Sequence, residues 1–153
     1  MKRLVLFSAL LLFIGCIHSP EGEKVHEGDA VPSFEVSAGA LKFRSPDDIR
    51  KGPAVLIFID PDCKDCHEYV SVLNECEGIV VISRSEDEAK VGRFAEETGI
   101  MHEVFFKGGN AAYYLMFHSI VPRVLFVRDA RIERIYAEPD VPGVVEIQQF
   151  LTD

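Results

Sequence analysis

The sequence predicts a single α/β domain with a central mixed β-sheet that is flanked by helices on both faces. Two uninterrupted apolar runs, residues 54–59 and 79–82, are typical of strands that are covered on both faces. Segments with apolar residues at helical spacing separate the strands, and a strand pair followed by a helix closes the chain. The 153 residues, of which 48% are hydrophobic, suffice for one domain with its own core.

The first predicted elements are a hairpin and a turn that precede the central strand. Residues 34–36 alternate like a short strand, and residues 39–43 fit its hairpin return. Residues 45–50 have the pattern of a helical turn. The run at 54–59 lies between a Gly-Pro pair and an Asp-Pro pair, and these breakers bound it as the central strand.

A helix is predicted directly after the central strand, with one apolar face and an end at Gly78. Its inward positions recur at helical spacing: Cys66, Tyr69, Val70, Leu73 and Cys76. After the second buried strand, Ser85-x-x-Glu88 has the form of a capping box, which predicts the start of another helix. Val91, Phe94 and Ala95 are predicted to face inward in that helix, and Gly99 is its predicted stop.

The remaining predicted elements are a short strand, a helix, a strand pair and a final helix: residues 104–106, 111–117, 124–127, 132–137 and 144–151. Gly108 and Gly109 predict a turn rather than a phosphate loop, because no Lys-Ser/Thr follows them. Asp129 and Ala130 join the strand pair, and Pro142 precedes the final helix.

The N-terminus has the pattern of an export signal. Lys2 and Arg3 precede an apolar run, residues 4–14, that is too short to span a bilayer. The run ends in Phe-Ile-Gly-Cys16, which resembles the lipobox of bacterial lipoproteins and implies a lipid anchor on Cys16. The predicted parts are a signal peptide, a lipidated cysteine with a flexible tether, and the domain: residues 1–15, 16–27 and 28–153.

The charge balance excludes one class of partner. The chain has 16 Lys and Arg against 25 Asp and Glu, and loss of Lys2 and Arg3 with the signal peptide takes the net charge from −9 to −11. Binding to nucleic acid needs a basic surface, so no nucleic-acid partner is expected. An acidic domain is also repelled by anionic lipids, so membrane attachment must come from the lipid on Cys16.

The sequence Cys63-Lys64-Asp65-Cys66 lies between the central strand and the following helix. Unpaired N–H groups and the helix dipole at a helix start stabilise a thiolate, which is the reactive form of cysteine. Cys63 is placed to use that field, and Cys66 lies one turn later. The spacing therefore predicts a dithiol that can close to a disulfide.

The chain resembles the extracytoplasmic thioredoxin-like thiol–disulfide oxidoreductases, in the membrane-anchored branch that is close in sequence to peroxiredoxins. The likeness extends over residues 28–151 and is carried by four segments in order: residues 28–34, 52–66, 120–127 and 129–132. It implies a thioredoxin-like fold without a cofactor and a place in the cell envelope, facing the periplasm or extracytoplasmic space. It also implies two kinds of partner, namely exported proteins with thiols or disulfides and an unidentified electron donor.

The resemblance assigns roles to four residues. Cys63 would be the nucleophile and Cys66 the resolving thiol. Pro122 would be the cis-proline that faces them, and the backbone of Val121 would pair with a bound substrate.

Several positions depart from the family pattern. Asp62 replaces the tryptophan that usually precedes the first cysteine, and Ile57 stands where thioredoxins have a buried acid. Arg123 replaces the threonine that commonly follows the cis-proline, and Ala130 replaces a turn glycine. Without the buried acid, the proton of Cys66 is expected to pass to water, to Asp60 or to Glu68.

Charges near Cys63 are expected to set its redox behaviour. Lys64 and the helix N-terminus favour the thiolate, whereas Asp60, Asp62 and Asp65 oppose it. Three carboxylates argue against a strongly acidic thiol, and the hypothesis that follows is a reductase or an isomerase rather than a strong oxidant.

Four other functions are open at this point. Cys63-x-x-Cys66-His67 fits c-type haem attachment, although a haem needs a pocket that such a sheet lacks. The two thiols with His67, His102 or His118 fit a copper-delivery protein. A peroxidase is disfavoured because Asp60 stands where peroxiredoxins have threonine. A non-catalytic interaction domain is the fourth. Ten helical residues, about 15 Å, separate Cys76 from Cys66, which is too far for a disulfide, so we interpret Cys76 as a core thiol.

Overall fold

Strand β3 (Pro53–Ile59) is the centre of a five-stranded mixed sheet with the order β5-β4-β3-β6-β7. It pairs in parallel with β4 and antiparallel with β6. The computed structural model describes residues 24–117 and 120–153. The other strands are β1 (Phe34–Ala38), β2 (Leu41–Ser45), β4 (Ile79–Ser83), β5 (Val104–Phe105), β6 (Arg123–Arg128) and β7 (Arg131–Ala137). The helices are α1 (Lys64–Val70), α2 (Glu88–Thr98), α3 (Gly109–Met116) and α4 (Val144–Thr152), with 3₁₀ turns η1 (Asp47–Ile49) and η2 (Leu73–Glu75).

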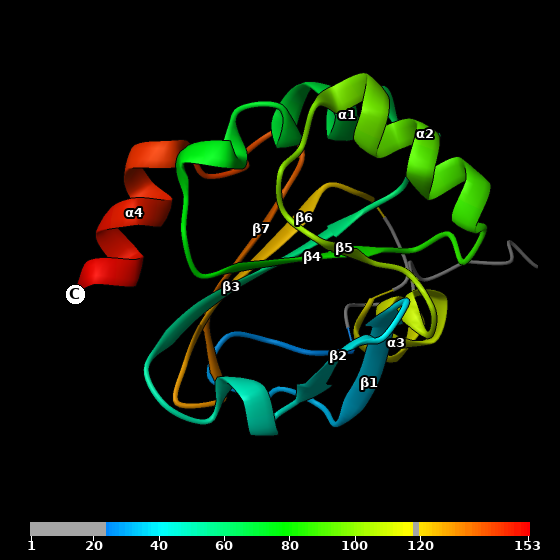
Figure 1. Ribbon diagram of the computed structural model, residues 1–153. Helices are drawn as coiled ribbons and strands as arrows, with labels where there is room; N and C mark the ends of the chain where they lie inside the picture. Colours follow the sequence, from blue (N-terminus) through cyan, green and yellow to red (C-terminus); the bar gives the residue numbers. More distant parts are fainter. Residues whose placement is uncertain (1–23, 118–119) are drawn as a thin grey trace, which may run out of the picture.

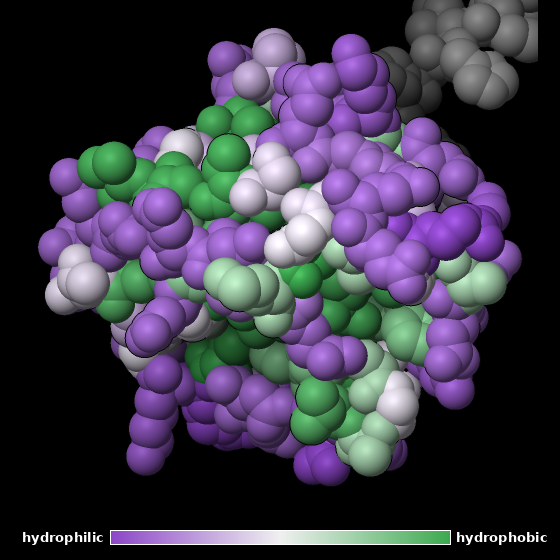
Figure 2. All heavy atoms as spheres, turned by 45° about the horizontal axis from the view of Figure 1, so that its top comes forward, coloured by the Kyte–Doolittle hydropathy of each residue, from purple (hydrophilic) through white to green (hydrophobic). Residues whose placement is uncertain are grey.

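The helices cover both faces of the sheet, as the sequence predicts. In Figure 1, α1, α2 and α4 lie above the sheet, and α3 lies below it beside the β1–β2 hairpin. Residues 54–59 are all buried, which explains why their apolar run is uninterrupted. Phe58 points to the α3 side, where its ring lies 6.1 Å from that of Tyr113 and 5.5 Å from that of Phe117. The face of the molecule that Figure 2 shows is mixed, with hydrophilic side chains over much of it and hydrophobic ones gathered at the upper left and lower right.

The helix after the cysteine motif is shorter than predicted. α1 ends at Val70, and the chain turns through Ser71 and Val72 into η2 before β4 begins. The apolar residues that predicted one helix up to Gly78 belong to two elements, α1 and η2, which bury the same side of the chain. Cys76 still lies in the core, fully buried at the end of η2.

The predicted capping box at Ser85 and Glu88 is wrong. The N-cap of α2 is Asp87, whose carboxylate accepts hydrogen bonds from the N–H groups of Ala89 and Lys90 at 3.0 and 3.2 Å. Aspartate is as good an N-cap as serine, and here it is the residue next to the first helical turn. Ser85 instead accepts a bond from the Asp87 N–H, at 3.4 Å.

The predicted turn at Gly108 and Gly109 proves to be a point of close packing. Gly108 has φ +82°, and a Cβ there would lie 2.5 Å from the carbonyl oxygen of Glu35 in β1. A Cβ on Gly109 would overlap the carbonyl oxygen of Ser83 in β4. Glycine at both positions therefore lets α3 begin against the hairpin and the sheet together.

Residues 24–27, which the sequence analysis assigned to the tether, contact the domain. Val25 is buried, and the Lys24 N–H donates to the Met116 carbonyl at 3.2 Å, where α3 ends. The Glu27 carboxylate accepts a bond from the Ile135 N–H in β7, at 3.0 Å. The predicted signal peptide and Cys16 lie outside the described residues. In the described part of the chain, no helix has the length and apolarity to cross a membrane.

These contacts predict that the segment stabilises the domain. Val25→Ala in residues 17–153 is expected to lower the free energy of unfolding by about 1–2 kcal/mol, because buried methyl groups are lost. Removal of residues 17–27 is expected to cost more, and urea denaturation measures both. Equal stability of residues 17–153 and residues 28–153 would contradict the packing of residues 24–27 against the domain. Lys42→Ala, an exposed residue, is the control.

Candidate active site

Cys63 and Cys66 are brought together by the start of α1. Cys63 is the N-cap, and its Sγ accepts a hydrogen bond from the Cys66 N–H at 3.3 Å. Its own N–H donates to the Asp60 carbonyl at 3.0 Å, which closes the turn between β3 and α1. Cys63 is half-buried, whereas Cys66 is fully buried. Burial, and then the hydrogen bond with Cys63, raise the pKa of the Cys66 thiol. The pair thus consists of one accessible sulfur and one protected thiol.

A second loop faces the cysteines from the start of β6. This cis-proline loop (residues 120–122) contains a cis peptide bond between Val121 and Pro122, the geometry that the resemblance implies. The Sγ of Cys63 lies 3.5 Å from the Val121 carbonyl oxygen. The two positions are separated by 58 residues of sequence, and β3 and β6 are neighbours in the sheet. The loop therefore presents a backbone acceptor next to the accessible sulfur.

Two of the three carboxylates expected to oppose the thiolate form ion pairs. The Asp60 carboxylate binds Arg84, with Nε 3.0 Å from Oδ2, and Asp62 binds Lys90 at 2.6 Å. The Lys90 hydrogen bond lowers the pKa of Asp62. Each pair has a weak net field at a distance, so the carboxylates oppose the thiolate less than their count suggests.

The other two predicted modulators lie in solvent. Lys64 pairs with Glu68 one turn along α1, at 3.4 Å, and Asp65 is exposed on the same helix. Glu68 is therefore held on the outer face of α1 by Lys64. This leaves Asp60 as the carboxylate beside the buried thiol, since its charge is among the causes that raise the pKa of Cys66.

Ile57 is fully buried in β3, in register with Val81 of β4 and Val124 of β6. The position that holds an acid in thioredoxins is thus part of the hydrophobic core. Any proton acceptor for Cys66 has to come from another place, and Asp60 lies just past the end of the same strand.

Arg84 is a site residue that the sequence analysis missed. It directly follows β4, and its N–H donates to the Ile59 carbonyl at 2.8 Å. Because β3 and β4 are parallel, their carboxyl ends meet at one sheet edge, and Arg84 reaches Asp60 there. The signal was available in the sequence, namely a charged residue directly after a buried strand.

The histidines considered as metal or haem ligands make other bonds. Nε2 of His67 lies 2.8 Å from the Pro61 carbonyl, and Nε2 of His102 lies 3.0 Å from the Leu73 carbonyl. A carbonyl only accepts, so both nitrogens carry hydrogen and do not offer a lone pair. His118 lies outside the described residues. Within residues 24–117 and 120–153, no cluster of three metal-ligating side chains is found.

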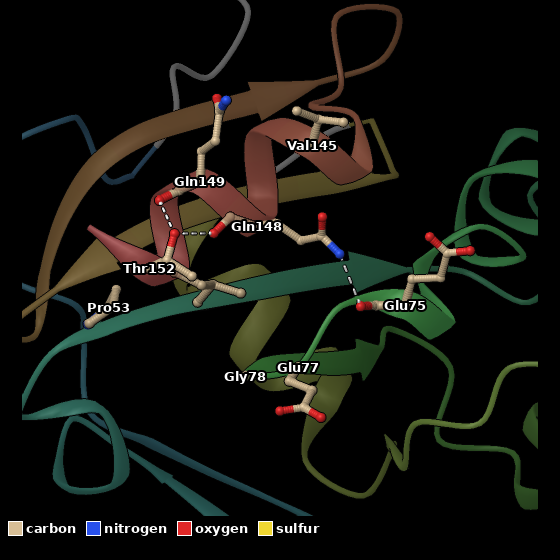
Figure 3. Close-up of a pocket in the computed structure, with 9 residues that line it drawn as sticks. Pro53, Glu75, Glu77, Gly78, Val145, Gln148, Gln149 and Thr152 are labelled. Atoms are coloured by element: carbon tan, nitrogen blue, oxygen red, sulfur yellow. Dashed lines mark hydrogen bonds between the residues drawn. The ribbon is translucent and has the colours of Figure 1, made fainter.

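A cavity of about 780 Å³ lies at the opposite end of β3 (Figure 3). Gln148 of α4 crosses it and donates to the Glu75 carbonyl at 3.2 Å. Pro53, where β3 begins, lies on its edge, which places it about 20 Å from the end of that strand. Its lining holds no thiol or imidazole, and it is separate from the cysteine site.

No protein-family model and no curated protein matches the sequence. Several solved structures, in contrast, superpose on this one. A candidate protein disulfide isomerase from Bacteroides thetaiotaomicron superposes with a TM-score of 0.74 at 17% identity, covering 86% of this chain and 94% of that one. A candidate thiol:disulfide interchange protein DsbE from Chlorobium tepidum gives 0.64 at 15% identity, covering 74% and 86%. A secreted Mycobacterium tuberculosis disulfide oxidoreductase, homologous to E. coli DsbE, gives 0.62 at 15% identity, covering 78% and 94%.

These comparisons establish the predicted thioredoxin-like fold. The structures named above are described as thiol–disulfide oxidoreductases, a yeast mitochondrial 1-Cys peroxiredoxin also shares the fold, and this chain has a Cys-x-x-Cys pair at the start of α1.

Proposed function

We propose that the protein is an extracytoplasmic thiol–disulfide oxidoreductase that acts on exported proteins as a reductase or an isomerase. The observation that carries the proposal is the asymmetry of the cysteine pair. Cys63 is partly exposed, and its Sγ accepts a hydrogen bond from the Cys66 N–H, whereas Cys66 itself is fully buried. Cys63 attacks a substrate disulfide, and Cys66 then resolves the mixed disulfide. Val121 and Pro122 support the substrate chain beside Cys63.

The surroundings of Cys63 support a reductase or isomerase over a strong oxidant. A strong oxidant has a reduced form that is stabilised, which requires strong stabilisation of the thiolate. In the described residues, the Cys63 sulfur hydrogen-bonds to the Cys66 N–H, the Val121 carbonyl and the Cys66 thiol, and all three partners are uncharged. The nearest cation in sequence, Lys64, pairs with Glu68.

We also propose that a lipid on Cys16 holds the site close to a membrane. The Lys24 N–H donates a hydrogen bond to the Met116 carbonyl. Residues 26 and 27 line a cavity together with Arg123, the residue that directly follows the cis-proline loop. The chain therefore meets the domain at the end that bears the cysteines. Eight residues lead from Cys16 to Lys24, a reach of at most ~28 Å. An electron donor within or at the membrane fits this distance.

The reduction potential of the pair tests the proposal. Residues 17–153 are equilibrated in glutathione or dithiothreitol buffers, and the free thiols are counted by alkylation and mass measurement. We expect a reversible two-electron couple well below about −120 mV, the potential of a strong oxidase. Cys76→Ala is the matched control, and it should leave the couple unchanged. Absence of a reversible couple would reject disulfide exchange, and thiols protected by added Cu(I) would favour copper delivery.

A further inference from the structure

Arg84 connects the two loops that form the site. Its guanidinium binds the Asp60 carboxylate on the cysteine side, and its Cζ lies 5.3 Å from the centre of the Tyr113 ring. The Tyr113 hydroxyl in turn donates to the carbonyl of Ile120, the first residue of the cis-proline loop, at 3.3 Å. One side chain from the end of β4 thus supports both sides of the site. The Cys63–Cys66 motif alone does not predict this role of Arg84.

The ion pair with Arg84 fixes the Asp60 carboxylate at the start of the turn that leads to the cysteines. Oδ1 of Asp60 accepts the Asp62 N–H at 3.0 Å, and Oδ2 accepts Arg84. The Asp60 side chain is only 15% exposed, so water screens the pair little. The Cys63 N–H donates to the Asp60 carbonyl at 3.0 Å, and the Cys66 N–H donates to the Cys63 sulfur at 3.3 Å, so Asp60 and Cys66 belong to one tight turn. Oδ2 accepts two hydrogen bonds from Arg84, whereas Oδ1 accepts one and keeps a second lone pair, which can accept a proton.

We propose that Asp60 is the base that accepts the proton of Cys66 in the resolving step, and that Arg84 is the positioning residue that holds the Asp60 carboxylate in place. The inference rests on the proposed disulfide exchange and adds a base at a position different from that of thioredoxins. It explains why residue 57 can be an isoleucine, because Asp60 then takes the role of the acid that thioredoxins bury at that position.

The step balances as follows. A substrate sulfur is bonded to the Cys63 sulfur. The Cys66 thiol transfers its proton to the Asp60 carboxylate, and its electron pair forms the bond to the Cys63 sulfur. The bond between Cys63 and the substrate breaks, and the substrate sulfur leaves as a thiolate that takes up a proton. Two electrons have passed from the protein dithiol to the substrate disulfide.

The raised pKa of the Cys66 thiol makes a base necessary. A thiol whose pKa is raised by burial is protonated at neutral pH and does not attack until the proton is removed. Among the described residues, the titratable and charged groups that face Asp60 or Cys66 are Cys63, Arg84, Lys90 and Tyr113. Lys90 pairs with Asp62, and burial raises the pKa of Tyr113, so neither accepts the proton at neutral pH.

The test separates the two chemical steps. Reduced protein reacts with an aromatic disulfide, and Cys63 attack and Cys66 resolution each release one coloured thiolate. Asp60→Asn and Arg84→Gln are expected to slow the second release by ~10²-fold at neutral pH while changing the first by less than about threefold. Arg84→Lys keeps the charge and is expected to recover part of the rate. In Asp60→Asn, the second release should rise by about tenfold per pH unit, because hydroxide must take the proton.

Arg128→Gln is the matched control. Arg128 also forms an ion pair, with Glu133 at 3.0 Å, and its Cζ lies 4.9 Å from the centre of the Phe150 ring. It lies at the other end of β6, so both releases should keep their normal rates. Normal second release in Asp60→Asn and Arg84→Gln would overturn the inference, as would equal slowing of both releases with a lower melting temperature. Absence of any second release from the unaltered protein would instead reject the proposed function.

Discussion

Replacing Cys63 by serine is expected to abolish disulfide exchange, and replacing Cys66 by serine is expected to trap the protein covalently on its substrates. Cys63 carries the accessible sulfur, so its loss removes the nucleophile and should lower turnover by ~10³-fold or more. Cys66 is fully buried and cannot meet a substrate directly. Its loss leaves the first attack intact and removes only resolution. Mass measurement of the covalent adduct and turnover of a disulfide peptide distinguish the two outcomes.

Cys76→Ala provides the control for this pair. Cys76 is as buried as Cys66, but it follows η2 and is not part of the turn that holds Cys63 and Cys66. Its substitution should change stability slightly and leave exchange and adduct formation unchanged. An adduct that formed equally well on Cys63→Ser would assign the attack to another thiol and contradict the proposed order of steps.

The fold could be predicted from the sequence where a local pattern and the tertiary environment agree. The apolar run at 54–59 is one such case, because a strand covered on both faces has no polar side to show. The helix predicted to reach Gly78 is a case where they differ. Residues 66–76 keep one buried side through an α-helix and a 3₁₀ turn, and apolar spacing alone does not distinguish the two.

The site could be predicted only as far as it is local. Cys63 and Cys66 are placed by four consecutive residues, and their positions follow from the strand and helix on either side. Arg84 and Lys90 reach the cysteine loop from β4 and α2, so their pairing depends on sheet order, which the motif does not contain. The prediction made from the sequence about the charges around Cys63 therefore included the nearby acids but not the cations that form ion pairs with them.

Gly109→Ala is expected to destabilise the protein by about 3 kcal/mol or more, the largest effect we expect from a single added methyl group. A Cβ at this position would overlap the Ser83 carbonyl oxygen, which is backbone within β4 and cannot turn away. The start of α3 must then move off the sheet. Because α3 carries Tyr113, whose hydroxyl holds Ile120, disulfide exchange should slow together with the loss of stability. Urea denaturation and the two-step thiolate assay measure both effects.

Gly92→Ala is the opposite case and serves as the control. Gly92 lies inside α2, and a Cβ there meets nothing within 4 Å. Alanine favours a helix interior by about 1 kcal/mol over glycine, so this variant should be more stable than the unaltered protein. The same substitution thus has opposite signs at two helical glycines, and only the distance to neighbouring backbone separates them. If Gly109→Ala were as stable as Gly92→Ala, α3 would not begin against β4, and the route by which Tyr113 supports the cis-proline loop would be wrong.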